Sequence, residues 1–123
     1  MLISMNRLIL YVQDVARLKS FYQAHFRFTL VEEIPDEWVV FNAGAVEFAL
    51  HRVGEPYRGT APSRTHSNAK TVFSVPSGLA ALRDQLIDAG VAMRELKRYD
   101  GFSYLLCDGE DPEGNVFQLS QAD

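Results

Sequence analysis

The chain has 123 residues, enough for one compact domain, and its 47% hydrophobic and 23% charged residues are typical of a globular protein. No apolar run is long enough to cross a bilayer, which disfavours a membrane protein. A formal charge of −4, without any block of Lys and Arg, disfavours nucleic acid and anionic lipid as partners. A small molecule is the partner that this composition favours.

The sequence contains a single cysteine, Cys107, so one chain alone forms neither a disulfide nor a cysteine-rich zinc site. Because Cys107 ends the apolar stretch YLLC, we expect it to pack in the core rather than to act as a nucleophile. The N-terminal MLISMNRLIL lacks the apolar segment and small-residue cleavage pattern of a signal peptide. We therefore expect a cytoplasmic protein.

The first half of the chain predicts a strand, a helix and three further strands. The β-branched and aromatic run RLILYV indicates a strand over residues 7–12, and Asp14 is a good helix N-cap. The helix is expected to end near Arg27, since apolar residues recur at helical spacing up to that point: Val15, Leu18, Phe21, Tyr22 and Phe26. The later strands are expected over residues 29–33, 38–43 and 46–52.

The same order of elements follows a Gly-, Pro- and Ser-rich linker over residues 54–68. A strand is expected over residues 70–75, with Ser77 as the N-cap of a second helix that ends at Gly90. Three more strands are expected over residues 91–98, 102–108 and 115–120. The turn Asp111-Pro112-Glu113-Gly114 joins the last two, with Pro and Gly where a type I turn favours them.

The two halves superpose with a constant offset, which places Arg7 on Lys70, Asp14 on Ser77 and Arg27 on Gly90. This pattern predicts an internal repeat of βαβββ units. One helix for each group of four strands indicates an α+β fold of tandem βαβββ modules forming a curved mixed sheet. We expect a single domain over residues 1–123, with modules at about 6–53 and 69–121.

Side chains alternate between the two faces of a strand, so each module should turn one apolar face to its helix. The opposite face would carry a mixture of polar and apolar groups, as expected for a concave surface that receives a ligand. In the first and last strands of each module this face is formed by Arg7, Ile9, Tyr11; Glu47, Ala49, His51; Lys70, Val72, Ser74; and Val116, Gln118, Ser120.

The tandem βαβββ pattern, with YVxDVxRxxxFY after the first strand and DPEGNVFQL near the end, resembles the vicinal oxygen chelate superfamily. That superfamily includes glyoxalase I, extradiol dioxygenases, fosfomycin-resistance transferases and bleomycin-binding proteins. The resemblance extends from about Asn6 to Gln121. It implies the fold strongly and the activity weakly, because this fold serves unrelated functions.

The resemblance also implies where a divalent metal would bind in this fold. The family's metal-ligand positions correspond to Arg7 and Lys70 in the first strand of each module, and to Ala49 and Gln118 in the last strand. Arg has no lone pair to offer a metal, and Lys would have to lose its proton first. Two fixed cations would also repel a divalent ion. We therefore expect no metal and no cofactor at this position.

The candidate ligand-binding residues each have a structural alternative. Arg7 and Lys70 could hold an anionic group of a ligand, or they could form ion pairs with Glu47 or Glu95. Tyr11, Trp38, Tyr104 and Phe102 could line an aromatic wall, or they could pack in the core. Glu47 and His51 could transfer protons, or they could be a salt-bridge partner and a rim histidine.

These residues leave two functions open. The first is a metal-independent protein that binds a small molecule, with an anionic group as the favoured ligand chemistry, and that works as a homodimer. The alternative is a lactoylglutathione-lyase-like or dioxygenase-like enzyme, with a divalent metal relocated in the site or with acid–base chemistry at Glu47 and His51. Arg27 departs from the family's usual glycine at the helix end, so we expect a different turn there.

Overall fold

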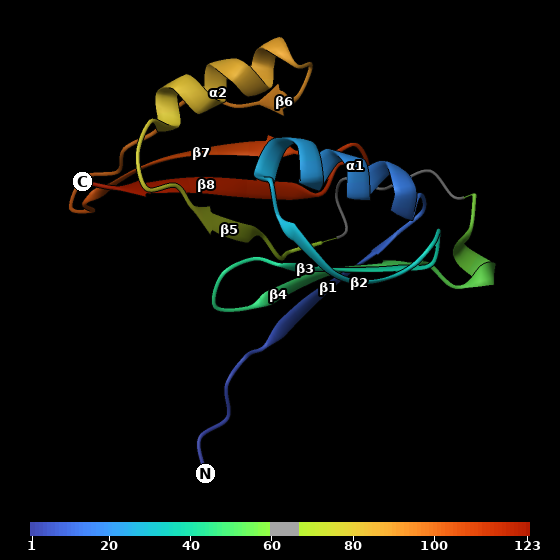
Figure 1. The fold of residues 1–123 in the computed structure, drawn as a ribbon. Helices are drawn as coiled ribbons and strands as arrows, with labels where there is room; N and C mark the ends of the chain where they lie inside the picture. Colours follow the sequence, from blue (N-terminus) through green and yellow to red (C-terminus); the bar gives the residue numbers. More distant parts are fainter. Residues whose placement is uncertain (60–66) are drawn as a thin grey trace. The chain divides into compact units, whose positions relative to one another are not determined.

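The computed structural model describes residues 1–59 and 67–123, which form two compact units, Met1–Pro62 and Ser63–Asp123 (Figure 1). Each unit holds a four-stranded sheet and one α-helix in the order expected from the repeat. The βαβββ organisation and the α+β fold class are therefore confirmed. The expected linker contains a short 3-10 helix, η1 (Glu55–Tyr57), and its residues 60–66 lie outside the described residues.

The first unit has the sheet order β1-β4-β3-β2. Its first strand pairs with the last one in parallel, and the other pairs are antiparallel, so the sheet is mixed. A β-bulge between Leu30 and Glu32 interrupts the register at the outer strand. The elements are β1 (Arg7–Val12), α1 (Val15–Phe26), β2 (Thr29–Ile34), β3 (Trp38–Asn42) and β4 (Glu47–Arg52).

The core of this unit lies between α1 and one face of the sheet. Asp14 caps the helix as expected, since its side chain accepts a hydrogen bond from the Arg17 amide at 3.0 Å. The apolar stripe of α1 is buried from Val15 to Tyr22, and the ring of Tyr22 packs edge-on against Phe48 of β4 with the ring centroids 4.8 Å apart. Because side chains alternate along β4, the neighbours of Phe48 face away from the helix.

The second unit repeats this arrangement with the sheet order β5-β8-β7-β6. The first and last strands again pair in parallel. The fully buried ring of Phe117 packs closely against Gly109 in the neighbouring strand, where the missing side chain leaves room for it. The elements are β5 (Thr71–Ser74), α2 (Leu79–Asp88), β6 (Ala92–Met93), β7 (Tyr104–Glu110) and β8 (Val116–Ala122).

Two expectations for this unit are wrong. The N-cap of α2 is Gly78 rather than Ser77, and no side chain of the cap bonds the helix. The amide of Leu79 instead donates to Gln121 Oε1 at 2.8 Å, so a strand residue satisfies the helix terminus. The strand expected over residues 91–98 is reduced to β6 and one isolated bridge between Lys97 and Leu106.

The ends of the two helices have similar backbone conformations. Gly90 follows α2 at φ +87°, as its sequence position predicts. Arg27 follows α1 at φ 55° and ψ 32°, which is also left-handed. The expectation that Arg27 would change the turn is therefore wrong, and the chain accepts an unfavourable conformation at that residue.

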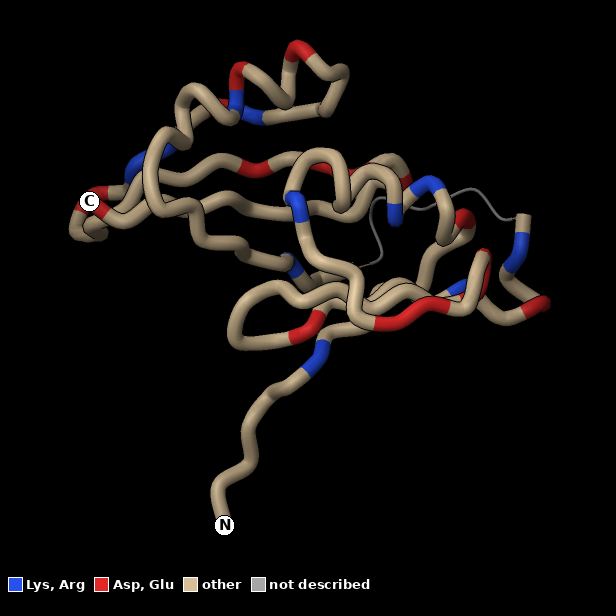
Figure 2. The backbone as a smooth tube through the Cα atoms, in the orientation of Figure 1, with Lys and Arg blue, Asp and Glu red and all other residues tan. Residues whose placement is uncertain are grey.

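No helix in the described part of the chain has the length and apolar character needed to span a membrane. Acidic and basic residues are interspersed along both units, as Figure 2 shows. This distribution agrees with the absence of a basic block from the sequence.

Candidate functional site

The face of the first sheet that points away from α1 is built in three rows of side chains. The strand register aligns one residue each from β1, β4 and β3 in every row. The alternation of side chains places all three rows on the same face. The rows are Arg7, Glu47 and Asn42; Ile9, Ala49 and Val40; and Tyr11, His51 and Trp38. We call this surface the open face of the first unit.

Arg7 is held by carboxylates in the first row. Its Nε and Nη2 both donate to Glu47 Oε1, at 3.1 and 2.8 Å, and Nη2 lies 3.5 Å from Glu32 Oε1. The ion pair with Glu47 is one of the two alternatives that the sequence left open, and it is confirmed. The Nη1 group of Arg7 has no partner among the described residues, so it keeps its N–H donors for a ligand.

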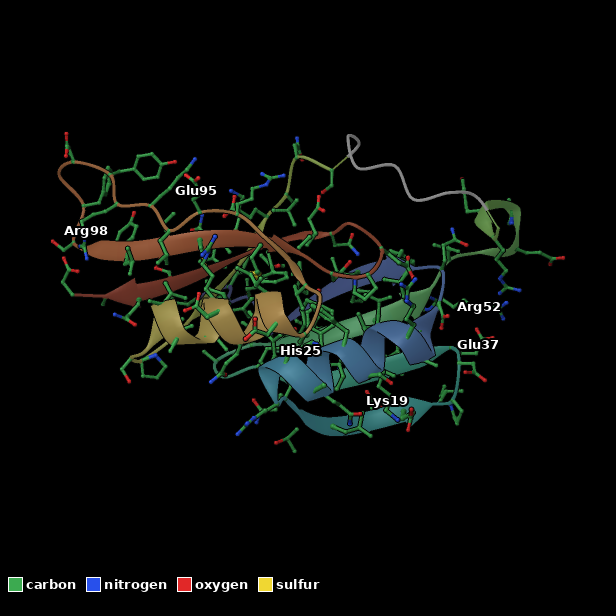
Figure 3. All side chains as sticks on the ribbon, turned by 90° about the horizontal axis from the view of Figure 1, so that it is seen from above. Lys19, His25, Glu37, Arg52, Glu95 and Arg98 are labelled. Atoms are coloured by element: carbon green, nitrogen blue, oxygen red, sulfur yellow. The ribbon has the colours of Figure 1, made fainter. Side chains whose placement is uncertain are left out.

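The third row brings three rings together from three adjacent strands. The Tyr11 and His51 ring centroids are 5.1 Å apart, and the His51 and Trp38 centroids are 5.5 Å apart. Tyr11 is 65% exposed and His51 is also exposed, so both rings are open to solvent. His51 Nδ1 lies 2.7 Å from the main-chain oxygen of Arg52. The neighbouring Arg52 side chain points to Glu37 and bonds it at 3.1 Å (Figure 3).

Arg7 and Trp38 meet although they belong to different rows. The guanidinium carbon of Arg7 lies 5.4 Å from the Trp38 ring centroid, a cation–π distance. The row between them carries Ala49, which has the short side chain of an alanine. Ala49 is fully buried, so it offers no surface to a ligand in this conformation. The predicted ligand contact at Ala49 remains a prediction.

Glu47 and His51 are not brought together. They lie in the first and third rows, with the row of Ala49 between them, and their backbones are about 13 Å apart along β4. Glu47 is engaged by Arg7, and His51 is engaged by the two aromatic rings. Nothing in this geometry lets the two side chains share one proton-transfer step.

The second unit has a polar cluster on the face of its sheet that points away from α2. Lys70 Nζ lies 2.8 Å from Asp108 Oδ2, and Gln118 Nε2 donates to Asp108 Oδ1 at 3.0 Å. Of the alternatives left open for Lys70, an ion pair with Glu47 or Glu95 is therefore wrong in its partner, which is Asp108. Burial acts to raise the pKa of Asp108, but the hydrogen bonds from Lys70 and Gln118 and the charges of Lys70 and Arg94 hold that pKa below its usual value.

Asp108 was missed in the sequence, where it was only the last residue of an expected strand. Its position could have been found from the turn that follows. The turn over residues 111–115 pairs Glu110 with Val116. Two residues further from the turn on each strand, Asp108 lies opposite Gln118. The hairpin geometry alone therefore predicts this contact.

Tyr104 lies on the same face of the second sheet as Asp108, but two rows away, opposite Ala122. Its ring is 5.8 Å from that of Phe102. The row that corresponds to the three rings of the first unit is formed by Ser74, Ser120 and Leu106. The two units therefore offer different surfaces, aromatic in the first and polar in the second.

The residues at the family's metal position do not fit a divalent ion. Arg7 and Lys70 are cations that donate hydrogen bonds, and Ala49 has no donor atom. Gln118 uses its amide nitrogen on Asp108. Within the described ranges, no group of three His, Cys, Asp or Glu residues could hold a metal ion. In neither unit do these residues form a donor set that suits a divalent ion.

Solved structures with the same fold cover nearly the whole chain. The antibiotic binding protein TnmS3 from Streptomyces sp. CB03234 has 20% identity and a TM-score of 0.78, over 100% of this chain and 99% of its own. A lactoylglutathione lyase from Agrobacterium tumefaciens has 18% identity and a TM-score of 0.75, over 96% and 92%. The fosfomycin resistance protein FosX from Listeria monocytogenes has 14% identity and a TM-score of 0.72, over 100% and 94%.

The structural similarity to these proteins establishes the fold, and their low sequence identities leave the activity open. A comparison with curated proteins gives no match. The family model of the Glyoxalase/Bleomycin resistance protein/Dioxygenase superfamily matches residues 4–119. The chain therefore belongs to the Glyoxalase/Bleomycin resistance protein/Dioxygenase superfamily.

Proposed function

We propose that this chain binds a small molecule without a metal, on the open face of the first unit. The observation that carries the proposal is the position of Arg7. Its guanidinium stands at a family metal position, lies 5.4 Å from the Trp38 ring centroid and keeps the Nη1 donors. A planar ligand with an anionic or carbonyl oxygen would meet these donors beside an aromatic surface formed by Tyr11, His51 and Trp38.

The second unit has candidate ligand-binding residues of its own, Lys70, Gln118 and Tyr104. The ammonium of Lys70 is balanced by Asp108, so the cluster with Gln118 is close to neutral. Lys70 and Gln118 would therefore offer hydrogen bonds, rather than a strong field, to a ligand on the second unit's own sheet, and Tyr104 would offer an aromatic edge there. In the first unit Glu47 and Glu32 offset the charge of Arg7, so the proposed preference for an anionic group rests on the Nη1 donors of Arg7 rather than on a net positive charge.

A second candidate is an enzyme with a relocated metal, resembling a lyase or a dioxygenase. The pair of Asp108 and Gln118 favours it, because carboxylate and amide oxygens are metal ligands. The ammonium of Lys70, 2.8 Å from Asp108 Oδ2, occupies one of those oxygens and opposes the candidate. Acid–base chemistry shared by Glu47 and His51 is disfavoured by their separation.

Thermal unfolding with added metals separates the two candidates. Zn²⁺, Ni²⁺, Mn²⁺ and Fe²⁺ are added one at a time, and the midpoint is followed for the native protein and for Asp108→Asn. A ligand that binds the folded state raises the midpoint by mass action. We expect no rise with any of the four metals. A rise in the native protein that is lost in Asp108→Asn would contradict metal-independent binding and support the second candidate.

Native mass spectrometry of the purified protein tests the small-molecule part of the proposal. It would show a carried ligand and the oligomeric state in the same spectrum. We also propose that the protein works as a homodimer, because β1 and β5 lie at sheet edges and carry exposed apolar residues such as Ile9 and Val72. A cytoplasmic location is proposed from the composition, with Cys107 as the lone and buried thiol.

A further inference from the structure

We propose that His51 selects the ligand by accepting a hydrogen bond from it, so that the open face favours hydroxyaromatic molecules over their O-methylated counterparts. The inference rests on the proposed small-molecule binding and adds a ligand class to it. It depends on which nitrogen of His51 carries the proton and on which rings surround the imidazole.

The proton of His51 is placed by its contact with the main chain. Nδ1 lies 2.7 Å from the carbonyl oxygen of Arg52, and a carbonyl oxygen can only accept a hydrogen bond. Nδ1 therefore donates. In the neutral imidazole the other nitrogen then carries a lone pair and no proton. Nε2 has no partner in the part of the chain that the structure describes, so it is available as an acceptor.

The rings on both sides hold the imidazole and provide a surface for an aromatic ligand. Tyr11 lies 5.1 Å away with a 49° tilt, and Trp38 lies 5.5 Å away at 72°. The strand register places the three residues directly opposite one another. An aromatic molecule that packs on this row gains ring contacts, and a hydroxyl on its edge can donate to Nε2.

The acceptor Nε2 of His51 also complements the donors of Arg7 on the same face. Arg7 offers only donors, and Glu47 is already engaged by Arg7 through Oε1. A ligand that carries an acceptor for Arg7 and a donor for His51 would be oriented in one direction. In the second unit Ser74, Ser120 and Leu106 occupy the corresponding row, so this selection belongs to the first unit.

Two probes with the same ring system test the inference. We would measure the binding of 2-naphthol and 2-methoxynaphthalene to the full chain by calorimetry. We expect 2-naphthol to bind about tenfold more tightly, since the net contribution of one hydrogen bond corresponds to roughly this factor. His51→Phe keeps a ring in the row and should remove the difference. His25→Phe, at the end of α1 (Figure 3), is the matched control and should retain it.

Imidazole ¹⁵N chemical shifts provide a second readout that a merely structural role would not change. In the free protein we expect a protonated Nδ1 and an unprotonated Nε2 for His51. Addition of 2-naphthol should move the Nε2 resonance, and 2-methoxynaphthalene should leave it unchanged. A His51 that carries its proton on Nε2 in the free protein would overturn the inference.

The outcomes distinguish this inference from the proposed function. Equal affinity of the native protein for both probes would overturn the role of His51 and leave small-molecule binding intact. No binding of either probe, together with native mass spectra that show no carried molecule, would overturn both. A difference that persists in His51→Phe would show that another group recognises the hydroxyl and would also overturn the inference.

Discussion

Asp108 lies directly opposite Gln118 in the β7–β8 hairpin, and the amide of Gln118 donates to Asp108 Oδ1 at 3.0 Å. Lys70 holds the other carboxylate oxygen at 2.8 Å. A carboxylate thus receives charge-assisted hydrogen bonds from Lys70 and Gln118, two residues that align by resemblance with the family's metal-ligand positions. The charge of Lys70 is therefore balanced by Asp108 of β7, whereas the charge of its counterpart Arg7 is balanced by Glu47 of β4.

The lowered pKa of Asp108 predicts a loss of stability in acid. Because its folded-state pKa lies below the ordinary value of 3.8, the ionised form stabilises the fold above that value, and this contribution is lost as the pH falls through the folded-state pKa. We expect Asp108→Asn to unfold at lower urea concentration than the native protein at pH 7, and the difference to shrink below about pH 4. Urea titrations from pH 7 to pH 3 measure it.

A control keeps this prediction specific to Asp108. Asp100→Asn removes a carboxylate from an exposed turn of the same unit and should leave the midpoint and its pH dependence almost unchanged. If Asp108→Asn and the native protein lost stability in parallel down to pH 3, the bonds from Lys70 and Gln118 would not be stabilising the ionised carboxylate.

Much of the fold was predictable because local patterns and tertiary structure agree. The apolar stripe of α1, its cap at Asp14 and the alternation along β4 each follow from residue spacing. The cap of α2 was not predictable, because the acceptor for its first amide is the side chain of Gln121, which lies far from the helix in the sequence. The prediction of a strand over residues 91–98 was wrong for a similar reason. This segment forms only a short ladder with β7, and the extent of pairing with a distant strand cannot be read from a local pattern.

The candidate site was predictable in its residues and less so in its partners. Alternation placed Arg7, Tyr11, Glu47 and His51 on one face, and the parallel register of β1 and β4 then brings Glu47 next to Arg7. The contact of Trp38 with Arg7 joins residues of different rows and depends on side-chain conformations, which residue spacing does not specify. The contact of Lys70 with β7 spans two strand pairings, because β8 lies between β5 and β7 in the sheet.

The ion pair of Arg7 and Glu47 should contribute modestly to stability. Both side chains are about one third exposed, at 32% and 35%, so solvent screens the attraction. In a double-mutant cycle with Arg7→Ala and Glu47→Ala, we expect a coupling energy of about 1 kcal/mol or less. Chemical denaturation of the four proteins measures it.

Arg7→Ala should affect binding more than folding. With 2-naphthoate as an anionic probe, we expect its affinity to fall about tenfold or more, because the guanidinium supplies the proposed donors. Arg17→Ala, on an exposed position of α1, is a matched control that should leave the affinity unchanged. Unchanged affinity in Arg7→Ala would remove Arg7 from the binding site.

Cys107 should be inert in the folded protein. It is buried, and burial raises the pKa of its thiol, with the charge of Asp108 acting in the same direction and Arg83 opposing it. We expect no reaction with a thiol reagent such as 5,5′-dithiobis(2-nitrobenzoate) in native buffer and full reaction in denaturant. A fast reaction in native buffer would contradict the assignment of Cys107 to the core.

Gly109→Ala should be strongly destabilising. A Cβ at this position would lie 2.5 Å from Met93 Sδ and 2.6 Å from Phe117 Cζ. The Met93 chain can move, but the Phe117 ring is fully buried and has little space to shift. We expect a loss of about 1–3 kcal/mol or more, measured by urea unfolding. Gly54→Ala, at φ −61° and with no neighbour closer than 3.8 Å to the added Cβ, tests whether close packing rather than glycine loss alone is responsible.

The left-handed residues that end the two helices allow a paired test of backbone strain. Arg27 sits at φ 55° and Gly90 at φ +87°, and a Cβ built at Gly90 meets nothing within 4 Å. The cost of a side chain at Gly90 is therefore conformational rather than steric crowding from neighbours. Because a non-glycine residue in this region costs about 1 kcal/mol, Arg27→Gly should stabilise the protein by about 0.5–1 kcal/mol and Gly90→Ala should destabilise it by a similar amount.

Urea unfolding of both variants and of the native protein checks the opposite signs. Arg27→Ala separates backbone strain from the Arg27 side chain, since it removes the side chain but keeps the Cβ, so we expect it to stay within about 0.5 kcal/mol of the native protein. If Arg27→Ala and Arg27→Gly stabilised equally, the gain would come from removing the arginine side chain. If Arg27→Gly destabilised the protein, the arginine side chain would stabilise the turn by more than the left-handed backbone costs.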